Sequence, residues 1–367
     1  MGKKIRIAIL YNQPVTGSVE GRKYVAENGK LQSELSGRRN GKQAKTNGRY
    51  ETVDISEMGV LEEMEDIKCA LNALGYRATT FNVDSDIFHL IDVLRGEKPD
   101  LIFNLVECVE NDSDQEMNVA GLYELLKIPY TGAGSLTLGI ALDKPRVKEI
   151  LAAHGIRTPR YQVFRMNDKI ELDPKLSFPV IVKPSREDAS VGISDDSVVY
   201  SPADLRKRVR YIHSEFKQPA LVEQYVEGRE INVAIMGNKK PVVFPISEID
   251  FSGLTADMHR IVSYDAKWMQ GTVAYVGTQG VCPARLSPED ETAMKDIALR
   301  CYRIIGCRDY ARVDIRLAKN GTPYVLEVNP NPDISDDAGF ARSAKAHGLA
   351  FNQVVGKIVE YALERCH

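Results

Sequence analysis

Near its carboxyl end the chain carries two apolar segments joined by a tight turn, and this pair constrains the fold more than any other feature. The segments are YARVDIRLA, from residue 310, and TPYVLEVNP, from residue 322, with Lys-Asn-Gly between them. Asn-Gly between two such runs predicts a β-hairpin. Each strand carries two polar residues at i and i+2, so all four side chains are expected on one face. They are Arg312, Asp314, Glu327 and Asn329.

Three oxygen-bearing side chains in an otherwise apolar strand pair suit a hard cation. Mg²⁺ prefers carboxylate, amide and phosphate oxygens, so Asp314, Glu327 and Asn329 are the predicted metal ligands. Arg312 beside them suits a developing oxyanion. The alternative is a buried ion-pair cluster of structural value, although such clusters add little net stability.

Two further segments offer groups that can bind a nucleotide. In VIVKPSREDASVGI, from residue 180, a lysine ends a strand and enters a loop of small residues whose N–H groups can approach phosphate oxygens. This loop lacks the Gly-Lys-Ser/Thr ending of a Walker A loop. In ALVEQYVEGREINV, from residue 220, Glu223 and Glu230 lie around a predicted strand, turn and strand. The alternative is a plain surface turn and two surface glutamates.

The first third of the chain alternates strands and helices, which predicts a parallel sheet covered by helices. Strands are expected at 5–10, 77–83 and 99–106, and helices at 60–74, 86–95 and 116–126. Later helices are expected at 145–154, 202–216, 288–305 and 349–364. Strands are expected at 178–185, 219–228, 229–237 and 240–249, followed by the closing hairpin. The hairpin and the earlier alternation together predict an α/β domain followed by α+β domains.

Composition and length exclude several classes of protein. A chain of 367 residues exceeds one ordinary core and predicts two or three domains. The net charge of −3 gives no electrostatic case for nucleic acid as a partner. The apolar start is too short to span a membrane and no cleavage pattern follows it. The six cysteines form no Cys-x-x-Cys and no zinc spacing, which predicts reduced thiols in a cytoplasmic protein.

Residues 17–50 interrupt the alternation of strands and helices. They hold six glycines and eight Lys or Arg against three acids, with almost no apolar periodicity. This composition predicts a mobile, solvated loop. The alternative is a basic arm that closes over an anionic ligand or contacts a partner.

Six blocks of sequence, in their order and spacing, resemble the D-alanine–D-alanine ligase branch of the ATP-grasp superfamily. They are IPYTGAG (128–134), ALDKPRVKEIL (141–151), FPVIVKPSREDASVGIS (178–194), LVEQYVEGREINVAI (221–235), SYDAKW (263–268) and YARVDIRL…YVLEVNPNP (310–332). The resemblance covers most of the chain and implies an ADP-forming ligase that joins a carboxylate to an amine.

The same resemblance implies a three-domain ATP-grasp architecture. An N-terminal parallel-sheet domain would span residues 1–132, with a basic insertion at 17–55. A small central domain would span 133–217, and a C-terminal antiparallel-sheet catalytic domain would span 218–367. ATP would lie between the last two domains.

The resemblance also implies a role for each matching residue. Lys144 and Lys183 would contact ATP phosphates, residues 186–192 would form the phosphate loop, and Lys267 would reach the γ-phosphate. Glu223 and the backbone of Val226 would meet adenine, and Glu230 the ribose. The nucleotide set also includes Ser185, Ser190, Gln224 and Leu326.

The implied metal site holds two Mg²⁺ ions, which Mn²⁺ could replace, on Asp314, Glu327 and Asn329, with Glu327 bridging. The first substrate's carboxylate would attack the γ-phosphorus, and an amine would then displace phosphate from the acyl phosphate. Arg312 would stabilise the tetrahedral intermediate. Residues 255–272 and 186–192 would exclude water as lids.

The substrate side departs from the pattern of the family. Glu57 keeps the family's Glu-to-Val spacing and would bind the first substrate's ammonium, unless it is an ordinary glutamate at a helix N-terminus. The family's His-Gly-x-x-Gly-Glu-Asp-Gly stretch is replaced by ECVENDSDQE at 107–116, and its paired serines by Ala189-Ser190.

After the hairpin the chain reads NPNPDISDDAGF, where the family has a glycine and a serine–leucine pair. Asp333, Asp336 and Asp337 would repel a second substrate that carries a free carboxylate. An amine-rich, amidated, larger or peptidic nucleophile would fit this charge better, unless some of these aspartates face solvent or cap a helix. D-alanyl-D-alanine is the default product, and another amino acid or a peptide is the rival.

Two functions outside ligation remain as alternatives. ATP-grasp scaffolds also host phosphotransferases, and a nucleotide-binding module without turnover would share the fold. The intact set of Arg312, Asp314, Glu327 and Asn329 argues against the second. The expected partners are small amino-acid or peptide substrates and a second copy of the chain, joined through the N-terminal domain, with no nucleic acid and no membrane.

Overall fold

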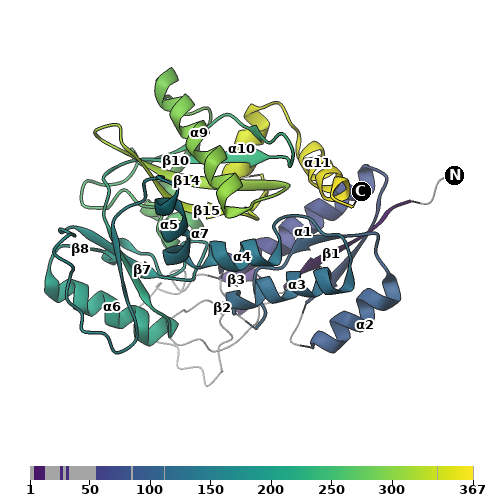
Figure 1. Ribbon diagram of the computed structural model, residues 1–367, viewed down its shortest axis with the longest axis horizontal. Helices are drawn as coiled ribbons and strands as arrows, with labels where there is room; N and C mark the ends of the chain where they lie inside the picture. Colours follow the sequence, from purple (N-terminus) through teal and green to yellow (C-terminus); the bar gives the residue numbers. More distant parts are fainter. Residues whose placement is uncertain are drawn as a thin grey trace.

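The computed structural model describes residues 4–12, 25–27, 30–32, 55–83, 86–110, 112–336 and 338–366. These residues form three larger sheets with helices packed against them, and a two-stranded hairpin of β2 (Val25–Glu27) and β3 (Lys30–Gln32) (Figure 1). The rest of the predicted basic loop lies outside the described residues. No helix in these ranges combines the length and the apolar character that crossing a membrane requires.

The first sheet is parallel, as the alternation of strands and helices predicts. Its order is β4 (Arg77–Asn82), β1 (Arg6–Tyr11) and β5 (Leu101–Leu105). Successive β1 residues point to opposite faces: Ile7 and Ile9 pack with α1 (Ile55–Ala73), and Ala8 and Leu10 pack with α2 (Ile87–Glu97) and α3 (Glu116–Leu126). The predicted helices and strands of this region are therefore confirmed.

The central sheet is antiparallel, in the order β6 (Tyr161–Phe164), β9 (Ala220–Gln224), β7 (Val180–Pro184) and β8 (Val198–Val199). One face packs on α6 (Pro202–Phe216) through residues such as Val182 and Val222. Alternation along the strands turns their neighbours, Lys183 and Glu223, to the opposite face. The apolar pattern of these two strands thus positions two of the predicted site residues.

The third sheet is also antiparallel and contains the predicted hairpin. Its order is β13 (Gln279–Val281), β12 (Ser247–Asp250), β10 (Gly228–Met236), β14 (Tyr310–Ala318) and β15 (Pro323–Asn329), with β11 (Val242–Val243) paired to β10. Val313 and Ile315 pack with α5 (Lys144–Ala153) and α9 (Pro288–Ile305). The polar positions of β14 therefore face the other side of the sheet.

Several details differ from the elements expected from the sequence. The run at 240–249 forms two short strands separated at Pro245, because proline cannot donate to the ladder. The polar loop before residue 270 contains α7 (Tyr264–Trp268), which begins after the N-cap Ser263. Further short elements are α4 (Ser135–Leu142), α8 (Val273–Val276), α10 (Gly339–Ala346), η2 (Ser113–Gln115) and η3 (Asp195–Ser197).

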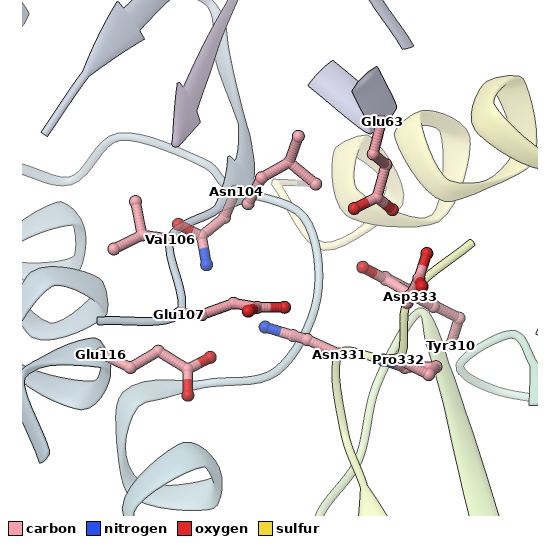
Figure 2. A pocket seen from close by; sticks show the side chains of 10 residues that line it. Glu63, Asn104, Val106, Glu107, Glu116, Tyr310, Asn331, Pro332 and Asp333 are labelled. Carbon is pink, nitrogen blue, oxygen red and sulfur yellow. The ribbon is translucent and has the colours of Figure 1, made fainter. Parts of the chain in front are cut away.

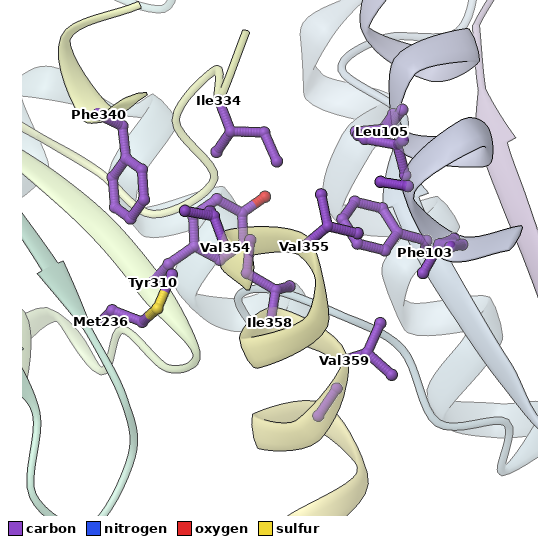
Figure 3. Packing of buried hydrophobic residues seen from close by; sticks show 14 of the residues in the cluster. Phe103, Leu105, Met236, Tyr310, Ile334, Phe340, Val354, Val355, Ile358 and Val359 are labelled. Atoms are coloured by element: carbon purple, nitrogen blue, oxygen red, sulfur yellow. The ribbon is translucent and has the colours of Figure 1, made fainter. Parts of the chain in front are cut away.

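The carboxyl-terminal helix α11 (Phe351–Glu364) joins the first and third sheets. Figure 3 shows its side chains Val355 and Ile358 between Phe103 of β5 and Tyr310 of β14. The end of the chain therefore packs back onto its beginning. The chain passes from the central to the third sheet between β9 and β10, after residue 224, because β9 pairs with β6 and β7.

Candidate active site

The hairpin places its four polar residues in register. Arg312 lies opposite Asn329, and Asp314 lies opposite Glu327. Arg312 Nε and Nη2 donate to the two oxygens of Asp314 at 2.8 and 2.9 Å. Asn329 Nδ2 donates to Asp314 Oδ2 at 2.9 Å. The structure therefore brings the four side chains together on one face of the sheet.

A fifth polar group, Asn232 of β10, joins this cluster. Asn232 is the register partner of Asp314, and its Nδ2 donates to Asp314 Oδ1 at 2.7 Å. Burial raises the pKa of the Asp314 carboxyl, and the Arg312 guanidinium acts in the opposite direction. No local pattern marks Asn232, because its neighbour in space lies 82 residues away in the chain.

Glu327 faces the lysines of neighbouring elements. Lys144 Nζ, at the start of α5, lies 3.9 Å from Glu327 Oε2 and 2.8 Å from Asp188 Oδ1. Burial raises the pKa of Glu327, but the positive charges of Lys144, Lys183 and Arg312 outweigh it and lower the pKa to about 2. Glu327 is therefore ionised, and Lys144 connects the hairpin with the predicted phosphate loop.

Lys183 and Glu223 belong to a buried triad with a lysine that the sequence patterns do not single out. Glu223 Oε2 lies 2.9 Å from Lys183 Nζ, and Glu223 Oε1 lies 2.5 Å from Lys148 Nζ. Lys148 Nζ also donates to Thr158 Oγ1 at 2.6 Å. Lys148 follows Lys144 by four residues, so both lie on one side of α5. That spacing is the signal by which Lys148 could have been found.

Burial and the neighbouring charges shift the pKa values of Lys148 and Glu223 in this triad. Burial lowers the pKa of Lys148 to about 8, although Glu223 acts in the opposite direction. Burial raises the pKa of Glu223, but Lys148 and Lys183 outweigh it, and the pKa falls below its usual value. Glu223 is thus a carboxylate held between two ammonium groups.

The remaining nucleotide residues of the prediction lie along β9, β10 and β15. Glu230 Oε2 pairs with Arg316 Nη2 at 3.0 Å, and the two residues are register partners. The side-chain amide of Gln224 donates to the carbonyls of Ser177 and Pro179 at 2.9 and 3.0 Å, so it holds the turn before β7. Val226 and Leu326 are half-buried.

The two predicted lids contact each other. Ser190 Oγ donates to the Val262 carbonyl and Trp268 Nε1 donates to the Ala189 carbonyl, both at 2.9 Å. Ala189 and Ser190 have φ of +53° and +61°, a left-handed conformation that is costly for residues other than glycine. Lys267 Nζ lies 4.6 Å from the centroid of the Trp268 ring. Ser185 is buried next to this loop, and its carbonyl accepts from the Lys144 amide.

Some of the departures from the family pattern line a pocket between the first sheet and the end of β15 (Figure 2). Glu107 and Glu116, the two ends of the altered stretch, line it together with Asp333. Asp336 is exposed and Asp337 lies outside the described residues. Glu57 lies in the first turn of α1, and its side chain also lies outside them.

The donor set on the hairpin fits a magnesium ion. Two carboxylates and one amide supply hard oxygen ligands in one place, which is the chemistry that Mg²⁺ selects. Elsewhere in the described ranges, no group of three His, Cys, Asp or Glu side chains gathers closely enough to hold a metal. Asp314, Glu327 and Asn329 are therefore the residues that would hold the ion.

Comparison with known proteins agrees with this arrangement. Residues 150–360 match the family described as the D-ala D-ala ligase C-terminus. A D-alanine–D-alanine ligase of Carboxydothermus hydrogenoformans is 32% identical over 303 residues, covering 80% of this chain and 90% of that protein. The uncharacterized protein y4sG of Sinorhizobium fredii is 34% identical over 265 residues, covering 72% and 75% of the two chains.

The fold is likewise shared with a solved structure. The crystal structure of D-alanine–D-alanine ligase from Bacillus anthracis complexed with ATP matches with a TM-score of 0.70 and 21% identity over 98% of both chains. The predicted ATP-grasp architecture is thereby confirmed. From the family match and the curated relatives, this chain belongs to the D-alanine–D-alanine ligase family.

Proposed function

We propose that this ligase uses ATP to activate the carboxylate of an amino acid and joins it to an amine. The observation that carries the proposal is the convergence of Arg312, Asp314, Glu327 and Asn329 on one sheet face, with Lys144 3.9 Å from Glu327. Membership of the D-alanine–D-alanine ligase family supports an ADP-forming reaction that makes a C–N bond.

The chain offers separate groups for each part of ATP. Lys144, Lys183 and Lys267 supply positive charge for the phosphates, and the backbone of residues 186–192 supplies N–H donors. Asp314, Glu327 and Asn329 would hold one or two Mg²⁺ ions, which neutralise phosphate charge when bound. Glu223 and Val226 are proposed for adenine and Glu230 for the ribose hydroxyls.

The proposed reaction has two steps. A carboxylate oxygen of the first substrate bonds to the γ-phosphorus, the bond from that phosphorus to the bridging oxygen breaks, and ADP leaves. The amine nitrogen next bonds to the acyl carbon, loses a proton, and the C–O bond to phosphate breaks. The guanidinium of Arg312 is proposed to stabilise the oxyanion of the second step.

Water must be kept from the acyl phosphate, and the two lids have the contacts to do this. The hydrogen bonds from Ser190 and Trp268 close the phosphate loop against the segment that carries Lys267. A closed site also strengthens each electrostatic contact inside it. Lys267 would then approach the γ-phosphate as part of the closed lid.

The decisive measurement is phosphate release by the purified chain with MgATP and a panel of D- and L-amino acids, alone and in pairs, with products identified by mass spectrometry. The proposal expects phosphate and an amide product in equal amounts. The Asp314→Asn variant should release neither, because it removes a metal-binding charge. A stable phosphorylated product without an amide would instead indicate a phosphotransferase.

The same panel decides between the two substrate proposals. Release driven by D-alanine alone, with the mass of D-alanyl-D-alanine, would identify the family's default product. A requirement for another pair would identify a different amino acid or a peptide. We further propose a cytoplasmic homodimer joined through the N-terminal domain, which sedimentation of the purified chain tests.

A further inference from the structure

The ion pair between Arg316 and Glu230 lies on the sheet face that carries the polar residues of the hairpin. Arg316 follows Asp314 by two residues on β14, so both side chains point to the same side of the sheet. Its neighbours Ile315 and Leu317 pack into the core on the other side. Glu230 is the register partner of Arg316 on β10. Arg316 therefore belongs to the polar face of the candidate active site.

The guanidinium of Arg316 is fixed by contacts with three groups. The residue is only 4% exposed, and its Nη2 lies 3.0 Å from Glu230 Oε2. Its Nη1 donates to the Gly228 carbonyl at 3.3 Å, and its Cζ lies 5.8 Å from the centroid of the Phe251 ring. A planar guanidinium with several partners loses little further freedom when a ligand binds nearby. Arg316 can therefore hold the carboxylate of Glu230 in one orientation.

Glu230 uses only one of its two carboxylate oxygens in this pair. Among the described residues, Arg316 is the one group that donates to its side chain, so Oε1 keeps its capacity to accept from a ligand. Burial raises the pKa of Glu230, Arg316 lowers it, and the charges of Asp314 and Glu327 raise it. Arg316 is thus the main attraction that favours the ionised carboxylate beside two other acids. An ionised carboxylate accepts stronger hydrogen bonds than a neutral group does.

Glu230 also lies on the strand that supports the candidate metal ligands. Asn232, two residues further along β10, donates to Asp314 Oδ1 at 2.7 Å. Two residues along a strand span about 7 Å. A nucleotide whose phosphates meet the metal ligands can therefore bring its ribose to Glu230.

We propose that Arg316 is a positioning residue that, through Glu230, makes the enzyme select nucleotides that carry ribose hydroxyls. The inference rests on the nucleotide-binding part of the proposed function. A ribose hydroxyl donates to Glu230 Oε1 while Arg316 holds Oε2, so the carboxylate stays charged and aimed at the sugar. A deoxy nucleotide leaves Oε1 without this donor, which weakens binding. Arg316 itself does not contact the nucleotide.

Calorimetric titration of the full chain with ADP, 2′-deoxy-ADP and 3′-deoxy-ADP, in the presence of Mg²⁺, tests this inference without requiring turnover. The wild type should bind ADP about tenfold more tightly than at least one of the deoxy nucleotides, which corresponds to one hydrogen bond to a charged group. Glu230→Gln should lower this preference, because an amide oxygen is a weaker acceptor than a carboxylate. Equal binding of all three nucleotides by the wild type would overturn the inference.

Substitution of Arg316 shows whether it acts through Glu230. Arg316→Met should reduce the preference for ADP about tenfold, because the carboxylate loses the group that orients it. Arg316→Lys keeps a positive charge opposite Glu230 and should restore most of the preference. In the Glu230→Gln background, Arg316→Met should cause no further loss. A further loss there would show a direct contact of Arg316 with the nucleotide, and it would overturn the inference, as would an unchanged preference in Arg316→Met.

Arg229→Met is the matched control for loss of an ion pair in the same sheet. Arg229 Nη2 lies 2.5 Å from Glu248 Oε2, and Arg229 precedes Glu230 directly, so it lies on the opposite face of β10. This variant should leave the preference for ADP unchanged, whatever its cost in stability. If Arg316→Met does not fold, Arg316→Gln takes its place with the same expected loss, because its shorter side chain leaves Glu230 without the guanidinium.

Turnover separates this inference from the proposed ligase function. Arg316→Met should raise the KM for ATP, change its kcat little, and leave the KM for the disfavoured deoxy-ATP near that of the wild type. No ADP formation with any substrate pair, together with the expected calorimetric preferences, would contradict the ligase function alone. An amide product formed with equal KM from ATP and from both deoxy nucleotides would contradict the role of Arg316 alone.

Discussion

Buried charged side chains at the site form ion pairs, and each pair connects two elements of the fold. Glu223 of β9 holds Lys183 of β7 and Lys148 of α5, and Arg316 of β14 holds Glu230 of β10. Removing one member of such a pair leaves a buried charge uncompensated. These contacts keep the lysines and carboxylates in place before a nucleotide arrives.

Lys148→Met tests this role at a residue outside the direct phosphate contacts. We expect a loss of about 3 kcal/mol in the free energy of unfolding, because Glu223 would lose one of its two ammonium partners. We also expect a higher KM for ATP, since Glu223 and Lys183 would lose their fixed positions. Urea unfolding and initial rates measure the two effects. Lys169→Met, which breaks an exposed pair with Glu171, should leave both unchanged.

The pH dependence of stability should also carry the signature of Lys148. Its pKa is lowered in the folded protein to about 8, below the usual 10.5, so the unfolded chain binds more protons between these values. The contribution of Lys148 to stability therefore rises as pH increases from 8 to 10.5 and is least favourable below 8. Unfolding of the wild type and Lys148→Met across this range should show the difference in stability growing with pH. A constant difference would contradict the shifted pKa.

Glu327→Ala tests the metal-ligand assignment. We expect ADP formation to fall by about a hundredfold or more, because phosphate charge would lose its neutralising ion. Circular dichroism should show an unchanged fold, since Glu327 is only partly covered and no strand core depends on it. Turnover at the wild-type rate would rule out Glu327 as a metal ligand.

At the scale of elements, two loops and one short helix form the cover of the site. The phosphate loop between β7 and η3 accepts a hydrogen bond from Trp268 of α7, and its Ser190 donates one to the Val262 carbonyl just before that helix. The left-handed conformation of Ala189 and Ser190 aims the Ala189 carbonyl at the indole. The nearest atom of Trp268 also lies 4.0 Å from the position of a Cβ added to Gly59, so α1 packs at the same point.

Trp268→Ala should loosen this cover and let water compete with the amine. We expect phosphate release to exceed amide formation, whereas the wild type should produce them in equal amounts. Trp268→Phe is the matched variant, because it keeps a ring beside Lys267 but loses the hydrogen bond to Ala189. An equal ratio of phosphate to amide in Trp268→Ala would show that this contact does not exclude water.

At the scale of the whole molecule, one apolar cluster unites the first and third sheets. Ile358 of α11 is fully buried, between side chains of β5 and β14 (Figure 3). Because α11 also packs on α1, neither sheet can unfold without exposing apolar side chains of the other. The pocket and the hairpin are held at a fixed spacing by the same cluster.

Ile358→Ala should lower the free energy of unfolding by about 2–5 kcal/mol through lost burial and a cavity. The unfolding transition should stay single and coincide for circular dichroism and for the fluorescence of the chain's one tryptophan. Leu125→Ala, at an exposed position of α3, is the control and should cost little. Two separate transitions in the wild type would contradict a shared core.

Much of the fold follows from periodicities that local sequence carries. Alternation of apolar residues predicts β14 and β15, and the Asn-Gly turn sets them side by side, so the convergence of Arg312, Asp314, Glu327 and Asn329 is predictable. Helices α3, α6 and α9 are predicted at their observed bounds, because prolines or acidic residues mark their first turns. The segments between these elements are less predictable, since α4 and α10 lack such signals.

The sequence by itself therefore determined the family, the parallel and antiparallel sheets, and the residues that share one strand face. Only the tertiary structure decided the partners that come from distant segments: Asn232 for Asp314, Lys148 for Glu223, and the Ile334 amide for Glu63, which lie as far as 271 residues apart. Local spacing reports on a face of one strand or helix, because side-chain direction repeats every two or 3.6 residues. Local spacing does not show which face of another element packs against that face, because this depends on how the sheets and helices pack together.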